Sequence, residues 1–370
     1  MTEFAAPLAT PVVLVLFNRP ALTAQVFAVI RQLRPCQLFL IADGPRPTHP
    51  DDVARCAATR QVVAQIDWPC SVQRNYSETN LGCGQRVASG LDWVFSQVDA
   101  AIILEDDILP DASFFPFCHD LLTRYRDDER VAYISGYNSL GHWNAAQTSY
   151  FACRHGSIWG WATWKRAWQH YDFTLARFRS WEIEAILAHH MPDPEHAAHQ
   201  AWIFHHYDGV TIDTWDIQWT LACLLSGGLC LMPSRNLVKN LGFHTEATHT
   251  VDPFDMRSDL ANFTLSMPLV HPDPAQIGAP DDQFDRWVFL LTLMNSYKDA
   301  RTLRLWQRLL DKSPTLVLPG HNAGLAYVLT PLRHPAEARQ ILTYWQKFLG
   351  DNQRLQQMIH AFSDMVEQAA

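Results

Sequence analysis

Three acidic side chains, Glu105, Asp106 and Asp107, follow directly after the apolar run Ile102–Leu104. Adjacent carboxylates repel one another and disfavour folding unless a cation offsets their charge. Mg²⁺ and Mn²⁺ prefer hard carboxylate oxygens, and they commonly take one or two of these together with phosphate oxygens. In a strand, Glu105 and Asp107 point to one side and Asp106 to the other. An acidic turn at the protein surface is the alternative, but the preceding strand favours a divalent metal site.

A second carboxylate, Asp216, has surroundings that suit acid–base chemistry, because Trp215 and Trp219 flank it and would shield it from water. A metal-bound diphosphate is a good leaving group, since the cation neutralises the charge that develops on it. Attack on the anomeric carbon of an activated sugar also needs a carboxylate that takes the proton of the attacking hydroxyl. Asp216 is the first candidate for this base and Asp213 the second. The alternative is that an aspartate only caps an aromatic helix.

Short β-rich runs alternate with amphipathic segments over about the first 140 residues. The pattern predicts helices over about 20–33, 51–66 and 85–98, and strands over Val12–Phe17, Gln37–Ala42, Ser71–Tyr76 and Ala100–Leu104. Strand and helix in alternation imply right-handed crossovers and a mostly parallel sheet. Ligands of such sheets bind at the carboxyl ends of the strands. Asn18 and Arg19, then Asp43, and then the acidic triplet all follow strands, so we expect them at one edge of the sheet.

The rest of the chain is less regular. Aromatic residues between about 141 and 250 either stack on sugar rings or fill a core: Trp143, Trp159, Trp161, Trp164 and Trp168. A helix is expected over Glu195–Asp208, with His199 and His206 on a solvated face. Residues 251–282 are rich in proline, glycine and aspartate and predict a linker or an extended strap. Residues 283–370 are expected to be a helical region, which packs on the rest of the chain or joins two copies.

The composition restricts the class of protein. A formal charge of -9 over 370 residues argues against a nucleic-acid-binding surface. The eight cysteines form no CxxC pair, which favours reduced thiols over a disulfide framework. The apolar run Val12–Phe17 is too short to cross a bilayer, and no basic segment precedes it. We therefore expect a cytoplasmic protein without a transmembrane segment; peripheral contact with a membrane stays open.

Several separated segments resemble one known family. In order along the chain they are VLVLFNRPALTAQVFAVIRQL, FLIADGP, GQRVASGLDWVFSQVDAAIILEDDILPDASFF, TWDIQW and PSRNLVKNLGFHTEATHT. Together they resemble the inverting N-acetylglucosaminyltransferase I family, and more closely the bacterial hemolysin-like sugar transferases of the same GT-A superfamily. The resemblance covers roughly residues 10 to 250. It implies a Rossmann-like GT-A fold over residues 1–282, with a nucleotide half to about 140 and an acceptor half over about 141–250.

The resemblance also implies roles for individual residues. Glu105 and Asp106 would hold the ribose and its surroundings, and Asp107, with Asp106 as a second ligand, would bind Mn²⁺ or Mg²⁺. Asp216 would match the family's base. The stretch 242–250 would close over the donor diphosphate. The other residues expected to contact the donor are Asn18, Arg19, Asp43 (at the base), Arg86, Gly242 and Thr248, and those that would add a metal contact are His244 or His249.

The implied enzyme is an inverting hexosyl- or N-acetylhexosaminyltransferase that uses a nucleotide-sugar, with a UDP-sugar favoured, and a glycan, lipid-linked or protein hydroxyl acceptor. Unlike the Golgi members, this protein is expected to have neither a membrane anchor nor an extracellular-type cysteine pattern. Its acceptor-side middle section also differs from theirs, so neither their sugar nor their acceptor carries over. A sugar nucleotidyltransferase is one alternative, although Asn18-Arg19-Pro20 lacks the glycines of its usual phosphate loop. A non-catalytic nucleotide-sugar-binding scaffold is the other.

Overall fold

The computed structural model describes residues 7–143, 147–175, 180–192, 194–206, 213–243 and 260–295. The chain divides into two compact units, and the first consists of Met1–Phe243 and Asp259–Arg286. Of the second unit, the structure describes only residues 287–295, the end of the last described helix, α10 (Asp282–Asn295). The sheet and the candidate site lie in the first unit.

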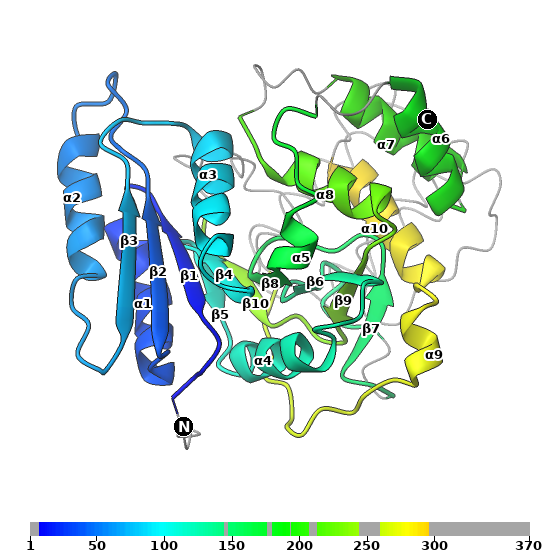
Figure 1. The fold of residues 1–370 in the computed structure, drawn as a ribbon, viewed down its shortest axis with the longest axis horizontal. Coiled ribbons are helices and arrows are strands. Elements are labelled where there is room, and N and C mark those ends of the chain that lie inside the picture. The colour runs from blue at the N-terminus through cyan, green and yellow to red at the C-terminus, as the bar shows by residue number, and fades with distance from the viewer. Residues whose placement is uncertain are drawn as a thin grey trace, which may run out of the picture. The chain divides into compact units, whose positions relative to one another are not determined.

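An eight-stranded mixed sheet forms the centre of the first unit, with the strand order β3-β2-β1-β4-β8-β6-β9-β7 (Figure 1). Six strands run in one direction, and β8 and β7 run antiparallel to their neighbours. The bounds are β1 (Val12–Leu16), β2 (Gln37–Ala42), β3 (Ser71–Tyr76), β4 (Ala100–Glu105), β6 (Val131–Ser135), β7 (Tyr150–Cys153), β8 (Trp161–Trp164) and β9 (Leu229–Pro233). The predicted α/β fold with a mostly parallel central sheet is confirmed.

Helices cover both faces of the β3-β2-β1-β4 half. On one face, α1 (Pro20–Leu33) and α4 (Phe114–Arg124) pack against side chains such as Leu14, Leu40 and Leu104. On the other face, α3 (Cys83–Phe95) lies so close to β2 that a Cβ on Gly90 would meet the side chain of Ile41. A strand with a helix on each face is buried on both sides, which explains why β1 and β4 are continuous apolar runs. The helix α2 (Asp52–Val62) packs beside α1.

The remaining elements of the first unit are short. A two-stranded antiparallel ribbon, β5 (Ile108–Pro110) with β10 (Val238–Asn240), continues beyond β4. The other helices are α5 (Lys165–Trp168), α6 (Ser180–His190), α7 (Pro194–His206), α8 (Asp216–Leu225) and α9 (Pro274–Ile277). The segment 260–281 buries Leu265, Leu269 and Ile277 in the main core, so this part of the expected linker is a strap. No helix in the described ranges is both long and apolar enough for a membrane span.

Most of the tryptophans in the second half form a core. Trp143, Trp161, Trp164 and Trp168 are buried, and Trp161 stacks on Trp215 with ring centroids 5.4 Å apart. Buried aromatic rings of this size contribute strongly to the stability of a core. Of the five tryptophans considered for sugar stacking, only Trp159 is partly exposed.

Two expectations about side chains have clear outcomes. The histidine face of α7 is not solvated at His199, which is 7% exposed, nor at the neighbouring His196, which is 4% exposed; the His206 side chain lies outside the described residues. His196 packs against His155 with ring centroids 4.3 Å apart. Burial lowers the pKa of both imidazoles, that of His155 to about 3. All eight cysteines are free in the structure.

Candidate functional site

The carboxyl ends of β1 and β4 form the point where the order of the sheet reverses. From β1 the chain proceeds outward to β2 and β3, and α3 then crosses back to place β4 on the other side of β1. Open α/β sheets bind ligands in the crevice outside this switch point. Arg19 follows β1 and the acidic triplet spans the end of β4, so both lie at the switch point.

Arg19 brings the two strand ends together. Its guanidinium lies 2.5 Å from Oδ1 of Asp106 and 2.6 Å from Oδ2 of Asp107. Asp106 is 1% exposed and also accepts a hydrogen bond of 3.0 Å from the backbone N–H of Phe17. Burial lowers the pKa of Arg19, but the charges of the triplet outweigh it and raise this pKa above its ordinary value. The cation that the triplet requires is therefore supplied, in part, by the chain itself.

Gly242 lies against the carboxylate of Asp107. After β10 pairs with β5, the backbone N–H of Leu241 donates to the Asp107 carbonyl at 2.8 Å, and the chain then passes directly beside the Asp107 side chain. A Cβ on Gly242 would lie 2.2 Å from Oδ2 of Asp107, so no larger residue fits without movement. The predicted donor-binding Gly242 and the predicted metal ligand Asp107 are thus in contact.

Asp216 lies near the triplet although more than a hundred residues separate them. It is the first residue of α8, and its Oδ1 accepts hydrogen bonds from the Thr214 hydroxyl and from the backbone N–H of Ile217. Its negative charge helps to raise the pKa of Glu105, which burial and Asp107 bring to about 8. Burial and the charges of Glu105, Asp213 and Asp216 also raise the pKa of the Cys83 thiol. Cys83 is not among the residues predicted for the site, because these carboxylates lie far from it in the sequence.

Asp213 holds the amino end of α3. Its two carboxylate oxygens accept hydrogen bonds of 2.8 Å from the backbone N–H groups of Cys83 and Gly84. Unpaired N–H groups at a helix start favour such an acceptor, and the helix dipole favours its negative charge. This arrangement explains the glycines on either side of Cys83, because a Cβ on Gly82 or Gly84 would overlap Asp213 or Thr214. Both oxygens of this second candidate base are engaged in a cap.

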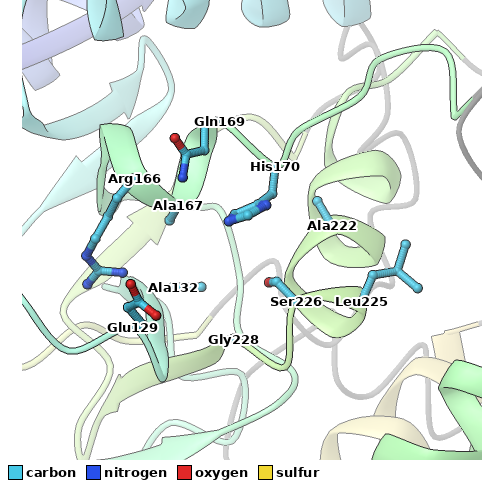
Figure 2. Close-up of a pocket in the computed structure, with 10 residues that line it drawn as sticks. All are labelled: Glu129, Ala132, Arg166, Ala167, Gln169, His170, Ala222, Leu225, Ser226 and Gly228. Atoms are coloured by element: carbon cyan, nitrogen blue, oxygen red, sulfur yellow. The ribbon is translucent and has the colours of Figure 1, made fainter.

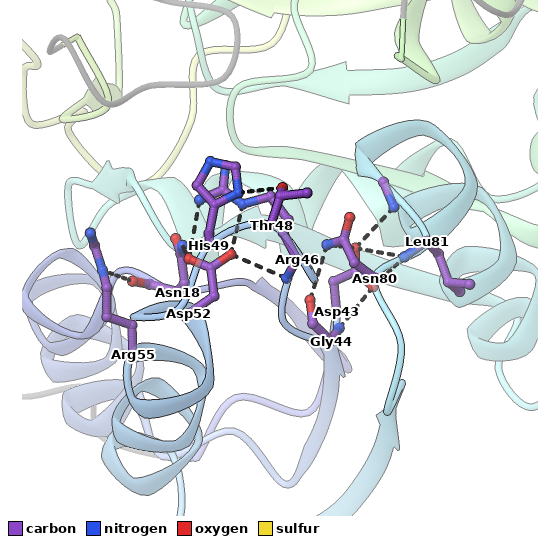
Figure 3. Close-up of polar contacts among 11 residues, drawn as sticks. Asn18, Asp43, Gly44, Arg46, Thr48, His49, Asp52, Arg55, Asn80 and Leu81 are labelled. Atoms are coloured by element: carbon purple, nitrogen blue, oxygen red, sulfur yellow. Dashed lines mark hydrogen bonds and ion pairs between the residues drawn. The ribbon is translucent and has the colours of Figure 1, made fainter.

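The Asp43 carboxylate is likewise engaged, mainly by the loop between β3 and α3. Its carboxylate accepts hydrogen bonds from the backbone N–H groups of Gly44, Leu81 and Gly82 and from the Asn80 amide (Figure 3). Burial raises its pKa in spite of these donors. Asp43 therefore fixes the loop between β3 and α3, and its predicted contact with the nucleotide base stays a prediction.

Asn18 belongs to a network that the sequence did not reveal. Its amide donates to Asp52 at 2.7 Å, and Asp52 also pairs with Arg46, 2.6 Å away (Figure 3). The hydrogen bond from Arg46 lowers the pKa of Asp52 to about 2, with help from Asn18. In the sequence, the local indication of Asp52 was its position at the start of a predicted helix.

Arg86 is another predicted donor-binding residue. It is 5% exposed, and its guanidinium donates to Asn75 at 3.2 Å.

The donor set at the triplet fits Mg²⁺ or Mn²⁺ shared with a ligand. No group of three or more histidine, cysteine, aspartate or glutamate side chains is arranged around one metal position in the described ranges. An ion that a diphosphate also holds needs only one or two protein carboxylates. Asp107 is the more accessible of the two predicted ligands, with a side chain 10% exposed against 1% for Asp106. The predicted contacts of His244, Thr248 and His249 lie outside the described residues.

A separate cavity of about 610 Å³ opens at the opposite edge of the sheet. It is bounded by Ala132 near the start of β6, by Gly228 just before β9 and by the end of α8, and the side chains around it include His170, Gln169 and Ser226 (Figure 2). These three polar residues are exposed on the surface. Because buried, convergent polar groups distinguish a ligand site from a surface hollow, the carboxyl edge is the stronger candidate.

No model of a known protein family matches the chain, and a search of curated proteins finds no match either.

Proposed function

We propose that this protein is a GT-A glycosyltransferase that moves a sugar, with inversion, from a nucleotide-diphosphate sugar to a hydroxyl group. The observation that carries the proposal is the meeting of Arg19 with Asp106 and Asp107 at the switch point of the sheet, with Asp216 close by. A cationic side chain beside paired carboxylates suits a diphosphate that brings its own divalent cation. The sequence resemblance, which covers the same residues, points to the same reaction.

In this proposal, one set of residues holds the donor, and Asp216 with its hydrogen-bond partners acts on the acceptor hydroxyl. Arg19 binds the diphosphate, with a UDP-sugar favoured as donor. Asn18 keeps the loop after β1 in place for the nucleoside, and Asp43 keeps the loop between β3 and α3 in place. Asp216 accepts the proton of the acceptor hydroxyl as its oxygen bonds to the anomeric carbon. The nucleoside diphosphate leaves with the electrons of the broken bond. Thr214 and the Ile217 N–H donate to one oxygen of Asp216, and this orients the other.

A bound Mn²⁺ or Mg²⁺ would neutralise the negative charge that develops on the departing diphosphate. Asp107 would hold this ion, and Gly242 leaves room for the carboxylate. The Arg19 guanidinium is 2.6 Å from Oδ2 of Asp107, so Arg19 must release this carboxylate or share it when the ion binds. Part of the charge of Arg19 then becomes available to phosphate oxygens.

The first test is a thermal-shift titration of UDP-, GDP-, CMP- and dTDP-sugars with and without Mn²⁺. One nucleotide class should stabilise the protein in a Mn²⁺-dependent manner, since a ligand that binds only the folded state raises the melting temperature. Asp107→Ala should abolish this metal dependence. Asp127→Ala, a surface carboxylate whose side chain is 84% exposed, is the matched control and should behave as wild type. Absence of any Mn²⁺-dependent shift would contradict the proposal.

The second test concerns the base. Asp216→Asn keeps the size of the side chain and should leave the donor-induced thermal shift nearly intact. It should abolish both the transfer of the sugar and the slow hydrolysis of the donor, because the amide takes no proton. Full activity of Asp216→Asn would exclude Asp216 as the base.

The same assays separate the alternatives. A sugar nucleotidyltransferase would release pyrophosphate from a nucleoside triphosphate and a sugar phosphate. A non-catalytic scaffold would show the thermal shift without any release of nucleoside diphosphate. The acceptor can be a glycan, a lipid-linked sugar or a protein hydroxyl. The helical region expected over residues 283–370, which packs on the rest of the chain or joins two copies, lies largely outside the described residues.

A further inference from the structure

Trp159 differs from the tryptophans that form the aromatic core around β8 and α8. Trp161, Trp164, Trp168, Trp215 and Trp219 are each at most 4% exposed and belong to the core. Trp159 is only partly buried, and it packs at the margin of the main core. Partial exposure of one indole is ordinary by itself, so the place of Trp159 relative to the carboxylates decides whether it can contact a ligand.

The topology places Trp159 at the same edge of the sheet as the carboxylates. Trp161 begins β8 and pairs with Ile103 of β4 in antiparallel register, so the residues before β8 lie at the carboxyl end of β4. Gly160 adopts a φ of +61°, and a Cβ there would crowd Val238, Ile108 and Leu104. The backbone beside Trp159 therefore lies against the strands that begin and end next to Asp107.

The neighbours of the indole connect it with the site. Phe243 meets Trp159 edge-on, with ring centroids 5.6 Å apart and planes at 83°. Phe243 directly follows Gly242, which is in contact with Asp107. Tyr137 meets the indole at 4.6 Å and 66°, so neither ring lies flat on it. Trp159 and Phe243 thus form an aromatic corner next to Asp107, on the β6–β8 side and away from Asn18 and Asp43.

We infer that Trp159 positions a pyranose ring at this site, with Phe243 as its side wall; the inference rests on the proposed sugar transfer. One face of a pyranose presents C–H groups with partial positive charge, and the face of an indole carries negative charge density. Such stacking fixes the plane of a sugar and leaves its hydroxyl groups free to react. The ring belongs either to the donor, beyond its diphosphate, or to a carbohydrate acceptor.

The direct test is saturation-transfer difference NMR with a panel of methyl hexopyranosides. Wild type should transfer saturation to the C–H protons of at least one sugar, and Trp159→Ala should lose this signal while Trp159→Phe keeps most of it. The matched control is Trp202→Ala, because Trp202 on α7 is 36% exposed. No signal with wild type, or an undiminished signal with Trp159→Ala, would overturn the inference.

Kinetics then identify the source of the ring. If Trp159 holds the donor sugar, Trp159→Ala should raise the KM for donor hydrolysis without acceptor by about tenfold, which corresponds to 1.4 kcal/mol. If it holds the acceptor, only the acceptor KM should rise. In both cases Trp159→Ala should show the same Mn²⁺-dependent thermal shift with UDP alone as wild type. If Trp159→Ala weakened the binding of UDP as much as the binding of the sugar, Trp159 would have a merely structural role. Failure of the proposed function is distinct, since wild type would then give no such shift with any nucleotide.

Discussion

Substitution of Gly242 by alanine tests the contact between β10 and the acidic triplet. The added Cβ would lie 2.2 Å from Oδ2 of Asp107 and 2.9 Å from Oδ1 of Asn240. An ordinary contact begins at 3.4 Å, so the carboxylate oxygen or the backbone must move by about 1.2 Å. That oxygen also pairs with Arg19 at 2.6 Å, and such a movement would break the ion pair.

The size of the effect follows from this overlap. Gly→Ala ordinarily stabilises a protein by about 0.4–1 kcal/mol, because it restricts the unfolded chain. Overpacking of a tight site costs about 1–3 kcal/mol, so Gly242→Ala should lower the free energy of unfolding by roughly 1–2 kcal/mol. A misplacement of about 1 Å in a catalytic group lowers the rate about a hundredfold, and we expect a loss of that order in donor turnover.

Urea denaturation and initial rates of donor hydrolysis measure both quantities. Gly278→Ala is the matched control, because a Cβ there would meet mainly the end of the half-exposed Arg130 side chain, at 3.0 Å. The control should keep wild-type rates. Wild-type stability and wild-type metal dependence in Gly242→Ala would refute the reasoning, since they would mean that Asp107 does not lie against residue 242.

Three further predictions concern charge and packing. Arg19→Met should leave Asp106 buried without compensation and lower stability by about 3–5 kcal/mol in urea denaturation without metal; Mn²⁺ should restore more stability to this variant than to wild type. Asp52→Asn should lower the free energy of unfolding by about 1–2 kcal/mol at pH 7, because the pKa of Asp52 in the folded protein is depressed to about 2. The difference in urea midpoint between the variant and wild type should shrink as the pH falls from 4 towards 2. A difference that stays constant with pH would contradict this role of Asp52. Asp213→Ala should remove the α3 cap and cost about 1 kcal/mol by the same measurement, whereas no change would show that solvent replaces the carboxylate.

The nucleotide half could be predicted well from the sequence. The bounds of β2 and β3 match the predicted ranges, and β1 and β4 differ by one residue each. Their signals are local: an apolar run, a turn after it and a helical pattern next. The bounds of α1 also match the predicted range, whereas α2 and α3 differ more. Helix α3 begins at Cys83 and not at Gln85, because the Asp213 carboxylate caps the earlier N–H groups.

The second half could not be predicted in the same way. Strands β6 to β10 have three to five residues each, and their pairing joins segments far apart in sequence, such as β7 with β9. The partners of Asp43 and Asp213 lie about 38 and 130 positions away, so no local pattern reveals them. Likewise, the sequence does not show whether Trp161 and Trp164 stack on sugars or fill the core, because this depends on their burial.

The carboxylate of Asp213 ties two parts of the site into one thermodynamic unit. It bonds the first turn of α3, which leads into β4 and the triplet, and it stands three residues before Asp216. Any ligand that shifts α3 must therefore strain or carry along the segment that bears Asp216, and the reverse holds equally. In the proposed transferase, binding of the donor and binding of the acceptor would then share a coupling free energy, which by linkage is the same in both directions.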